Sequence, residues 1–330
     1  MITRLHNPIA ALALLLAASF PAQSQTLLKP KSLGLPRTPD GHPDLQGTWN
    51  NSTLTPLQRR AEFAGKATLS DEEALAFENK DHRLFEERPD LSPDSLARVK
   101  ESNAIGAEAS EAWETGSALA RVDGLKRTSL IVDPPDGKIP GLTPEAKQRA
   151  AAASKNRERA DSVKDLTLKD RCLSFGPVPM VPQVYNSNYQ IVQTPGYVMI
   201  LGEMIHDARI IRMNATHASP GVRQWLGDAI GYWEGDTLVI DTTNFNNQIA
   251  FHGSTANLHV IERLSRSDAD TLLYRATIDD PATFSKPWTI EYPLVATTDR
   301  IFEYACHEGN SWVEAALSAA RKADAAVGAK

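Results

Sequence analysis

The strongest constraint on the fold lies between Leu173 and Asn310, where short segments of alternating hydrophobicity follow one another without helical segments between them. Turn residues separate these segments at intervals of roughly 8 to 14 residues, as in all-β domains. Eight strands are expected, near residues 189–193, 197–213, 230–234, 237–245, 258–266, 271–279, 287–295 and 301–306. Such a set favours a closed antiparallel β-barrel or a strongly curled sheet that holds one small ligand, with a β-sandwich as the alternative.

The densest part of this pattern runs from Tyr185 to Phe245 and contains polar residues that are costly on a strand unless they are paired or hydrated. One expected strand carries four of them: Glu203, His206, Asp207 and Arg209. Strict alternation would place His206 on the face opposite the other three. Asp241, among apolar neighbours on the next hairpin, needs a hydrogen-bond donor, and Arg209 is the expected partner.

Several fragments resemble a large family of secreted bacterial proteins that is common in soil and aquatic bacteria. They include EMIHDARII, VRQWLGD, YWEGDTLVIDTTNF, STANLHVIERLSR and EYACHEGN. The resemblance covers most of the chain after residue 24 and implies export, but it implies no particular reaction. The chain departs from the family pattern, usually Pro-Leu-Asp-Gly-Arg-Pro-His, in the segment from Arg212 to His217. This loop is therefore expected to be specialised for the protein's own ligand.

The N-terminus has the features of an export signal. Basic residues precede an apolar run from Ile9 to Phe20, and small residues follow it. A periplasmic or secreted protein is expected, without membrane insertion, because no later segment approaches ~20 uninterrupted apolar residues. In an oxidising compartment Cys172 and Cys306 are expected to form a disulfide, with two buried free thiols as the alternative.

The expected fold class is mainly β (α+β), a lipocalin-like barrel with helical N-terminal insertions. Four segments are expected: 1–24 as signal peptide, 25–67 as an extended segment with the first strand, 68–170 as a helical segment packed on the barrel, and 171–330 as the β region with a short C-terminal helix. Gly47-Thr48-Trp49 is similar to the first strand of lipocalin-like barrels, although a plain turn before a core Trp explains it as well. Helices are expected after Ser70, from Pro93 to Ala120, and from Thr143 to about Val163.

The net charge and the sequence motifs limit the kinds of binding partner that are expected. The net charge of −6 is spread along the chain without basic blocks, so no nucleic-acid partner is expected. The sequence has neither a Gly-rich nucleotide loop nor a Gly-x-Ser-x-Gly elbow. Its strand histidines are scattered, and none has the spacing of a helical zinc motif. Neither a cofactor nor a metal is expected, and the partner is expected to be an apolar small molecule.

Five residues are candidates for catalysis: His206, Arg209, Asp241, Tyr304 and His307. His206 is the expected acid/base, oriented by a carboxylate, and a core histidine bonded to a backbone carbonyl is the alternative. Arg209 is expected to stabilise an oxyanion, and an internal ion pair with Asp241 or Glu203 is the alternative. By alternation along the last expected strand, Tyr304 and His307 face opposite sides.

Two classes of function fit these expectations. The first is a cofactor-independent acid/base enzyme, of lyase, isomerase or hydratase type, acting on an aromatic or polycyclic small molecule. The second is a lipocalin-like protein that binds such a molecule without turnover. The number of ionisable groups in the β region favours the enzyme, and the absence of a strong catalytic motif favours the binder.

Overall fold

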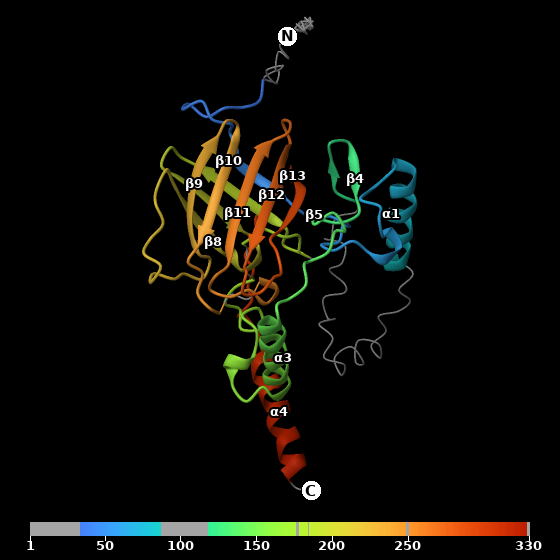
Figure 1. The fold of residues 1–330 in the computed structure, drawn as a ribbon, viewed down its shortest axis with the longest axis vertical. Coiled ribbons are helices and arrows are strands. Elements are labelled where there is room, and N and C mark those ends of the chain that lie inside the picture. Colours follow the sequence, from blue (N-terminus) through green and yellow to red (C-terminus); the bar gives the residue numbers. More distant parts are fainter. Residues whose placement is uncertain (1–33, 87–117, 176–177, 184, 249–250, 329–330) are drawn as a thin grey trace, which may run out of the picture. The chain divides into compact units, whose positions relative to one another are not determined.

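The fold of the chain is a closed β-barrel. The computed structural model describes residues 34–86, 118–175, 178–183, 185–248 and 251–328. The barrel strands are β1 (Gly47–Asn50), β6 (Asn188–Gln193), β7 (Tyr197–Gly202), β8 (Ala208–Met213), β9 (Asp228–Glu234), β10 (Thr237–Thr243), β11 (His259–Arg266), β12 (Thr271–Asp279) and β13 (Trp288–Ala296). They pair in this order, and β1 also pairs with β13, so the nine strands form a closed ring (Figure 1). The expectation of a mainly β barrel is confirmed.

The strand count and one strand direction differ from the expectation. Residues 197–213 form two strands, β7 and β8, whereas residues 301–306 form no strand. In addition, β8 pairs with β9 in parallel, so the barrel is mixed and the wholly antiparallel barrel of the sequence analysis is wrong. The connection between them is residues 214–227, which form no strand. This connection returns the chain to the end of the barrel where β8 begins, so β9 runs in the same direction as β8.

A tight turn divides β7 from β8. The short 3-10 helix η4 (Met204–His206) occupies it, and both Ile205 and His206 adopt a positive φ, of 58° and 47°. Gly202 N donates to the Asp207 carbonyl at 2.9 Å and closes the hairpin. The alternation expected across this segment is therefore wrong, and so is the alternation expected for Tyr304 and His307, which lie in an irregular segment.

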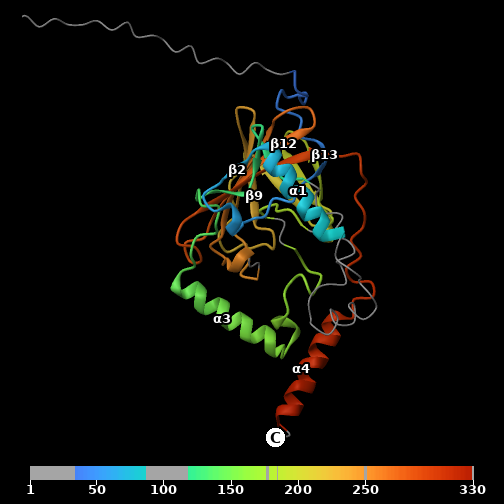
Figure 2. The same cartoon turned by 90° about the vertical axis from the view of Figure 1, so that its right-hand side faces the viewer.

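Helices and a small sheet lie outside the strand order of the barrel. The helices are α1 (Asp71–Glu86), α3 (Pro144–Arg159) and α4 (Trp312–Gly328), and Figure 2 shows all three. The small sheet has β2 (Thr68–Leu69), β3 (Arg121–Val122) and β4 (Leu125–Arg127), whereas β5 (Ile131–Asp133) pairs with β13. Of the helices described, none is long and apolar enough to span a bilayer.

Local signals explain where two helices begin. Before α1, the Ser70 hydroxyl accepts from Glu73 N at 3.2 Å, and the Glu73 carboxylate accepts from Ser70 N at 3.0 Å. This capping box satisfies two amides that the helix leaves unpaired. Thr143 caps α3 by accepting from Ala146 N at 3.1 Å, with Pro144 in the first turn. Both predicted helix starts are confirmed, whereas the signal peptide and most of the helix predicted from Pro93 lie outside the described residues.

Large side chains fill the interior of the barrel. Trp49, Trp288, Tyr274 and Tyr292 are at most 1% exposed and belong to the main hydrophobic cluster. Burial of a large apolar side chain contributes about 1.5–3 kcal/mol each to stability. Trp49 also donates from Nε1 to the Leu45 carbonyl at 2.9 Å, so its polar atom is satisfied inside the core.

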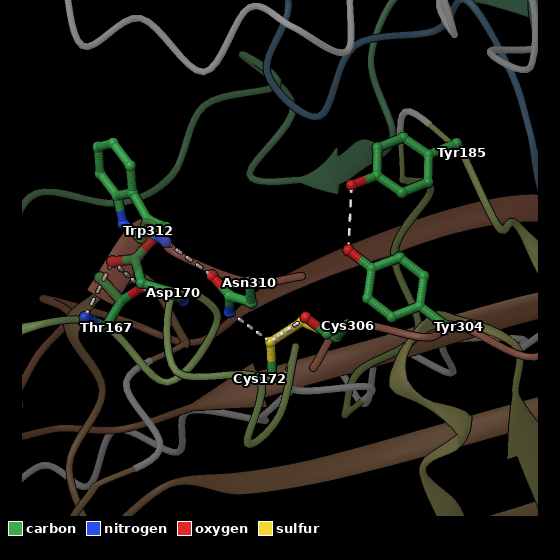
Figure 3. The surroundings of a disulfide bond; sticks show 8 residues. All are labelled: Thr167, Asp170, Cys172, Tyr185, Tyr304, Cys306, Asn310 and Trp312. Atoms are coloured by element: carbon green, nitrogen blue, oxygen red, sulfur yellow. Dashed lines mark hydrogen bonds between the residues drawn. A yellow bond between two sulfur atoms is a disulfide. The ribbon is translucent and has the colours of Figure 1, made fainter. Parts of the chain in front are cut away.

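A disulfide joins two segments that are distant in the sequence. Cys172 and Cys306 are bridged, with their Cα atoms 5.7 Å apart and a sequence separation of 134 residues (Figure 3). The predicted bridge is confirmed, and the alternative of two free thiols is wrong. The bond fixes the segment that follows α3 to the segment that precedes α4.

Candidate functional site

Arg209, one of the predicted catalytic residues, is part of a buried ion pair in the barrel interior. Its Nη1 donates to Glu262 Oε1 at 3.0 Å, and its Nη2 bonds the other carboxylate oxygen. Tyr274 Oη also donates to Glu262 Oε1, at 2.8 Å. The side chains of Arg209 and Glu262 are 2% and 0% exposed. Burial opposes the charge on Arg209, but Glu262 outweighs it and raises the pKa of the guanidinium.

This pair crosses the barrel interior, because β8 and β11 are separated by β9 and β10 in the order of strands. The partners expected for Arg209, Asp241 or Glu203, are therefore wrong. Glu203 instead accepts from Phe302 N at 3.0 Å. Arg209 has no free face toward solvent, and its contacts are those of a structural residue.

The other predicted residues lie in different surroundings. His206 and His307 are exposed. Tyr304 shares a hydrogen bond with Tyr185, Oη to Oη, at 3.2 Å (Figure 3). Asp207, the expected partner of His206, instead accepts from Ser174 Oγ at 2.9 Å, and burial raises the pKa of its carboxyl.

Asp241 is the predicted residue that lies within a cluster of ionisable groups. His259 Nε2 and His217 Nε2 lie 2.8 and 3.1 Å from its Oδ1. The other ring nitrogen of His217, Nδ1, lies 3.1 Å from Asp228 Oδ2. Arg212 Nη2 in turn donates to Asp228 Oδ1 at 2.7 Å. We call Asp228, His217, Asp241 and His259 the Asp–His cluster.

Strand register explains why these residues meet. Asp228 begins β9 opposite Thr243, and Val260, the second residue of β11, pairs with Thr242. The start of β9, the end of β10 and the start of β11 therefore lie at the same end of the barrel. Asp241 alternates with the inward-facing core residues Leu238 and Ile240, so its carboxylate points to the outside of the wall.

The loop from Asn214 to Gly227 adds His217 to the cluster. Ala218 N donates to Asp228 Oδ2 at 2.7 Å, and the Asn244 side chain donates to the Ala218 carbonyl at 3.1 Å. Gly227 ends this loop with a φ of 73°, and a Cβ there would lie 2.8 Å from the Thr243 carbonyl oxygen. Only glycine meets both requirements without strain.

The electrostatics of the cluster favour ionised carboxylates. Burial opposes ionisation of Asp241, but the hydrogen bonds and charges of His259 and His217 outweigh it and hold the pKa of that carboxyl below its usual range. Burial likewise opposes ionisation of Asp228, and the Ala218 amide, Arg212 and His217 together lower its pKa. The hydrogen bond that the His259 ring donates to Asp241 raises the pKa of His259, against a smaller effect of burial.

The four side chains of the Asp–His cluster differ in their exposure to solvent. The side chain of Asp228 is 4% exposed, those of His217 and Asp241 are 25% exposed, and that of His259 is 43% exposed. Within the described chain, Nδ1 of His259 has no hydrogen-bond partner. His259 is thus the member with both a carboxylate partner and a ring nitrogen that a small molecule can reach.

Three members of the cluster were missed by sequence reasoning: His217, Asp228 and His259. The loop containing His217 was expected to be specialised for a ligand, but nothing in the sequence indicated the partners of His217. His259 is one of the scattered strand histidines, and the sequence pattern gave it no partner. In the residues that the structure describes, no group of three or more His, Cys, Asp or Glu residues is arranged to hold a metal ion.

Comparisons with known proteins do not assign the site. No protein-family model, curated protein or solved structure matches this chain.

Proposed function

We propose that the Asp–His cluster is a proton-transfer site and that the protein is an exported acid/base enzyme of lyase, isomerase or hydratase type. Its substrate is an apolar small molecule of aromatic or polycyclic kind. The observation that carries the proposal is the 2.8 Å contact between Asp241 Oδ1 and Nε2 of the accessible His259. His259 thereby replaces His206 as the proposed acid/base.

The contact supports this role in two ways. With Nε2–H donating to Asp241, the neutral ring presents the lone pair of Nδ1 as a base, and the carboxylate stabilises the cation that forms when Nδ1 takes a proton. The hydrogen bond to Asp241 also raises the pKa of His259 above its ordinary value, which makes the ring a stronger base.

The contact between His217 and Asp228 supports the contact between His259 and Asp241. His217 lies between Asp241 and Asp228, and Arg212 bonds Asp228 from the other side. These contacts hold His217 against Asp241 Oδ1, the oxygen that His259 also contacts, and so help to fix the carboxylate. Such positioning keeps the base in one orientation, which is required for efficient proton transfer.

Elimination, isomerisation and hydration all involve proton transfer at carbon, so hydrogen–deuterium exchange tests the proposal without knowledge of the natural substrate. Aromatic and polycyclic ketones, such as 2-tetralone, are incubated with the protein in D₂O, and deuterium incorporation is followed by NMR. The wild type is expected to accelerate exchange of at least one of these ketones. His259→Gln should reduce that acceleration by about 10²–10⁴-fold, the usual contribution of a positioned acid or base.

His307→Gln is the matched control, because His307 is an exposed histidine outside the cluster. It should exchange at the wild-type rate. An unchanged rate in His259→Gln would remove His259 from the mechanism. Binding of the ketones by the wild type without any exchange above the buffer rate would instead favour the alternative, a small-molecule binding protein without turnover.

A further inference from the structure

A cleft of about 610 Å³ shares no lining residue with the Asp–His cluster. Its walls come from α3, from residues 164–175 that follow it, and from the segment around the short 3-10 helix η5 (Phe251–Gly253). This volume is within the range of small-molecule pockets, which are about 300–1,000 Å³.

Three cations line the cleft: Lys164, Lys169 and Arg171. None of them forms an ion pair with a described residue. Asp165 is the acidic residue of the lining, and its carboxylate is engaged by Ser162, whose N and Oγ lie 2.8 and 3.2 Å from Oδ2. With three cations and one carboxylate, the lining of the cleft carries a net positive charge.

Aromatic rings form the apolar part of the same cleft. Phe251 stacks on Trp288, with ring centroids 5.9 Å apart and an interplanar angle of 11°, and Trp288 is fully buried in the barrel core. His252 meets Phe251 edge-on at 4.7 Å. Phe175, on the other wall, lies 4.7 Å below the ammonium of Lys169. A flat apolar group thus has aromatic surfaces to contact beside the cations.

The wall that carries the cations is held in place by local bonds. Thr167 Oγ1 donates to Asp170 Oδ2 at 2.6 Å, and Asp170 N donates back to Thr167 Oγ1 at 3.1 Å. The disulfide from Cys172 anchors the end of this segment, as Figure 3 shows. A wall that is ordered before binding loses little conformational entropy when a ligand binds.

We infer that this cleft binds a small organic anion with an aromatic ring system, whose acidic group contacts Lys164, Lys169 and Arg171 and whose ring packs on Phe251. Carboxylates and sulfonates are the acidic groups that guanidinium and ammonium donors bind with charge-assisted hydrogen bonds. The inference does not depend on proton transfer at the Asp–His cluster.

The test compares two fluorescent probes that share their rings and differ in charge. 8-Anilinonaphthalene-1-sulfonate carries a sulfonate, and N-phenyl-1-naphthylamine has the same rings without it. The folded full-length protein is expected to bind one equivalent of the sulfonate probe at least about tenfold more tightly than the neutral probe at low ionic strength. Added salt should reduce this preference, because partly exposed charges are screened.

Substitutions then assign the preference to the cleft. Replacement of all three cations by Gln should weaken the sulfonate probe about tenfold and leave the neutral probe unchanged, whereas Phe251→Ala should weaken both. Lys147→Gln, on α3 but outside the lining, is the matched control and should bind both probes as the wild type does. Circular dichroism shows whether the triple variant is folded. If it is unfolded, the three single Gln variants replace it, and each should weaken the sulfonate probe by a smaller factor without affecting the neutral probe.

Equal affinity of the wild type for the two probes would overturn the inference. So would a folded triple variant that retains the wild-type affinity for the sulfonate probe, because the charge would then act elsewhere.

Discussion

At the scale of residues, Arg209 and Asp241 show how a closed barrel separates side chains that a strand pattern places together. Arg209 points inward and pairs with Glu262, whereas Asp241 points outward to His259 and His217. Removal of one partner from a buried ion pair costs about 3–5 kcal/mol, since it leaves an uncompensated charge. A substitution of Arg209 is therefore expected to lower the stability of the fold.

The first prediction concerns the titration of His259. The hydrogen bond that the ring donates to Asp241 is the largest cause of its raised pKa, and the charge of Asp279 is a smaller one. Asp241→Asn should therefore lower the pKa of His259, followed by NMR from the ring Cε1 proton. Asp279→Asn, which removes a charge but no hydrogen bond to the ring, is the control and should lower it less. An equal effect of the two variants would show that the hydrogen bond does not hold the ring.

The contact between His259 and Asp241 also determines how stability changes with pH. The raised pKa of His259 gives stability that is present below the unfolded value of ~6.5 and is lost as pH rises through the folded pKa. The lowered pKa of Asp241 gives stability that is present above ~3.9 and is lost as pH falls through the folded pKa. The difference in Tm between wild type and Asp241→Asn should thus be largest between about pH 4 and 6.5.

At the scale of elements, the sequence predicted strands better than connections. Alternation placed β6, β10, β11, β12 and β13 to within a few residues, because each has one face in the core. It failed at Ile205 and His206, where two non-glycine residues of positive φ turn the chain shortly after Gly202. It also gave no sign of the parallel β8–β9 pair, since the path of a loop depends on contacts distant in sequence.

The candidate site was less predictable than the strands, because it depends on contacts between residues that are distant in the sequence. Asp241 was identified because a carboxylate within an apolar strand needs a partner. The identity of that partner depends on the register of β10 against β11 and on the loop that ends at Gly227, and neither follows from local pattern. His206 and His307 were chosen for their acidic sequence neighbours, yet both are exposed and lie outside the Asp–His cluster.

The second prediction tests that loop through Gly227→Ala. The new Cβ would lie 2.7 Å from Thr242 Cγ2 and 2.8 Å from the Thr243 carbonyl oxygen, at a φ of 73°. Left-handed backbone costs a non-glycine residue about 1–2 kcal/mol, and overpacking adds about 1–3 kcal/mol. A loss of about 2–5 kcal/mol in the free energy of unfolding is expected from urea denaturation.

Gly221→Ala in the same loop is the matched control. A Cβ at Gly221 meets nothing within 4 Å, and its φ is not positive, so its stability should stay within about 0.5 kcal/mol of wild type. Similar losses in the two variants would mean that the loop responds to any substitution and that Gly227 has no special role.

At the scale of the whole molecule, both proposed sites lie near one end of the barrel wall. His259 pairs with Asp279, and the adjacent Ile278 pairs with Trp288, on which Phe251 stacks. The start of β11 and the start of β13, where Trp288 stacks on Phe251 of the cleft, therefore lie at the same end of the barrel. This arrangement follows from strand directions alone, because β11 and β13 both begin at this end.

The third prediction concerns the disulfide that anchors the wall of the cleft. Cys172 and Cys306 close a loop of 134 residues, and replacement of both by Ala should lower the free energy of unfolding by about 2–5 kcal/mol, the usual effect of removing a native bridge. The strands keep their own hydrogen bonds and core, so the far-UV circular dichroism of the folded variant should match wild type. The segment with Lys169 and Arg171 loses its covalent anchor, so affinity for the anilinonaphthalene sulfonate should fall while hydrogen–deuterium exchange at the Asp–His cluster persists. An unchanged urea midpoint, or two thiols that alkylate in the wild type without reductant, would contradict the structural role of the bond.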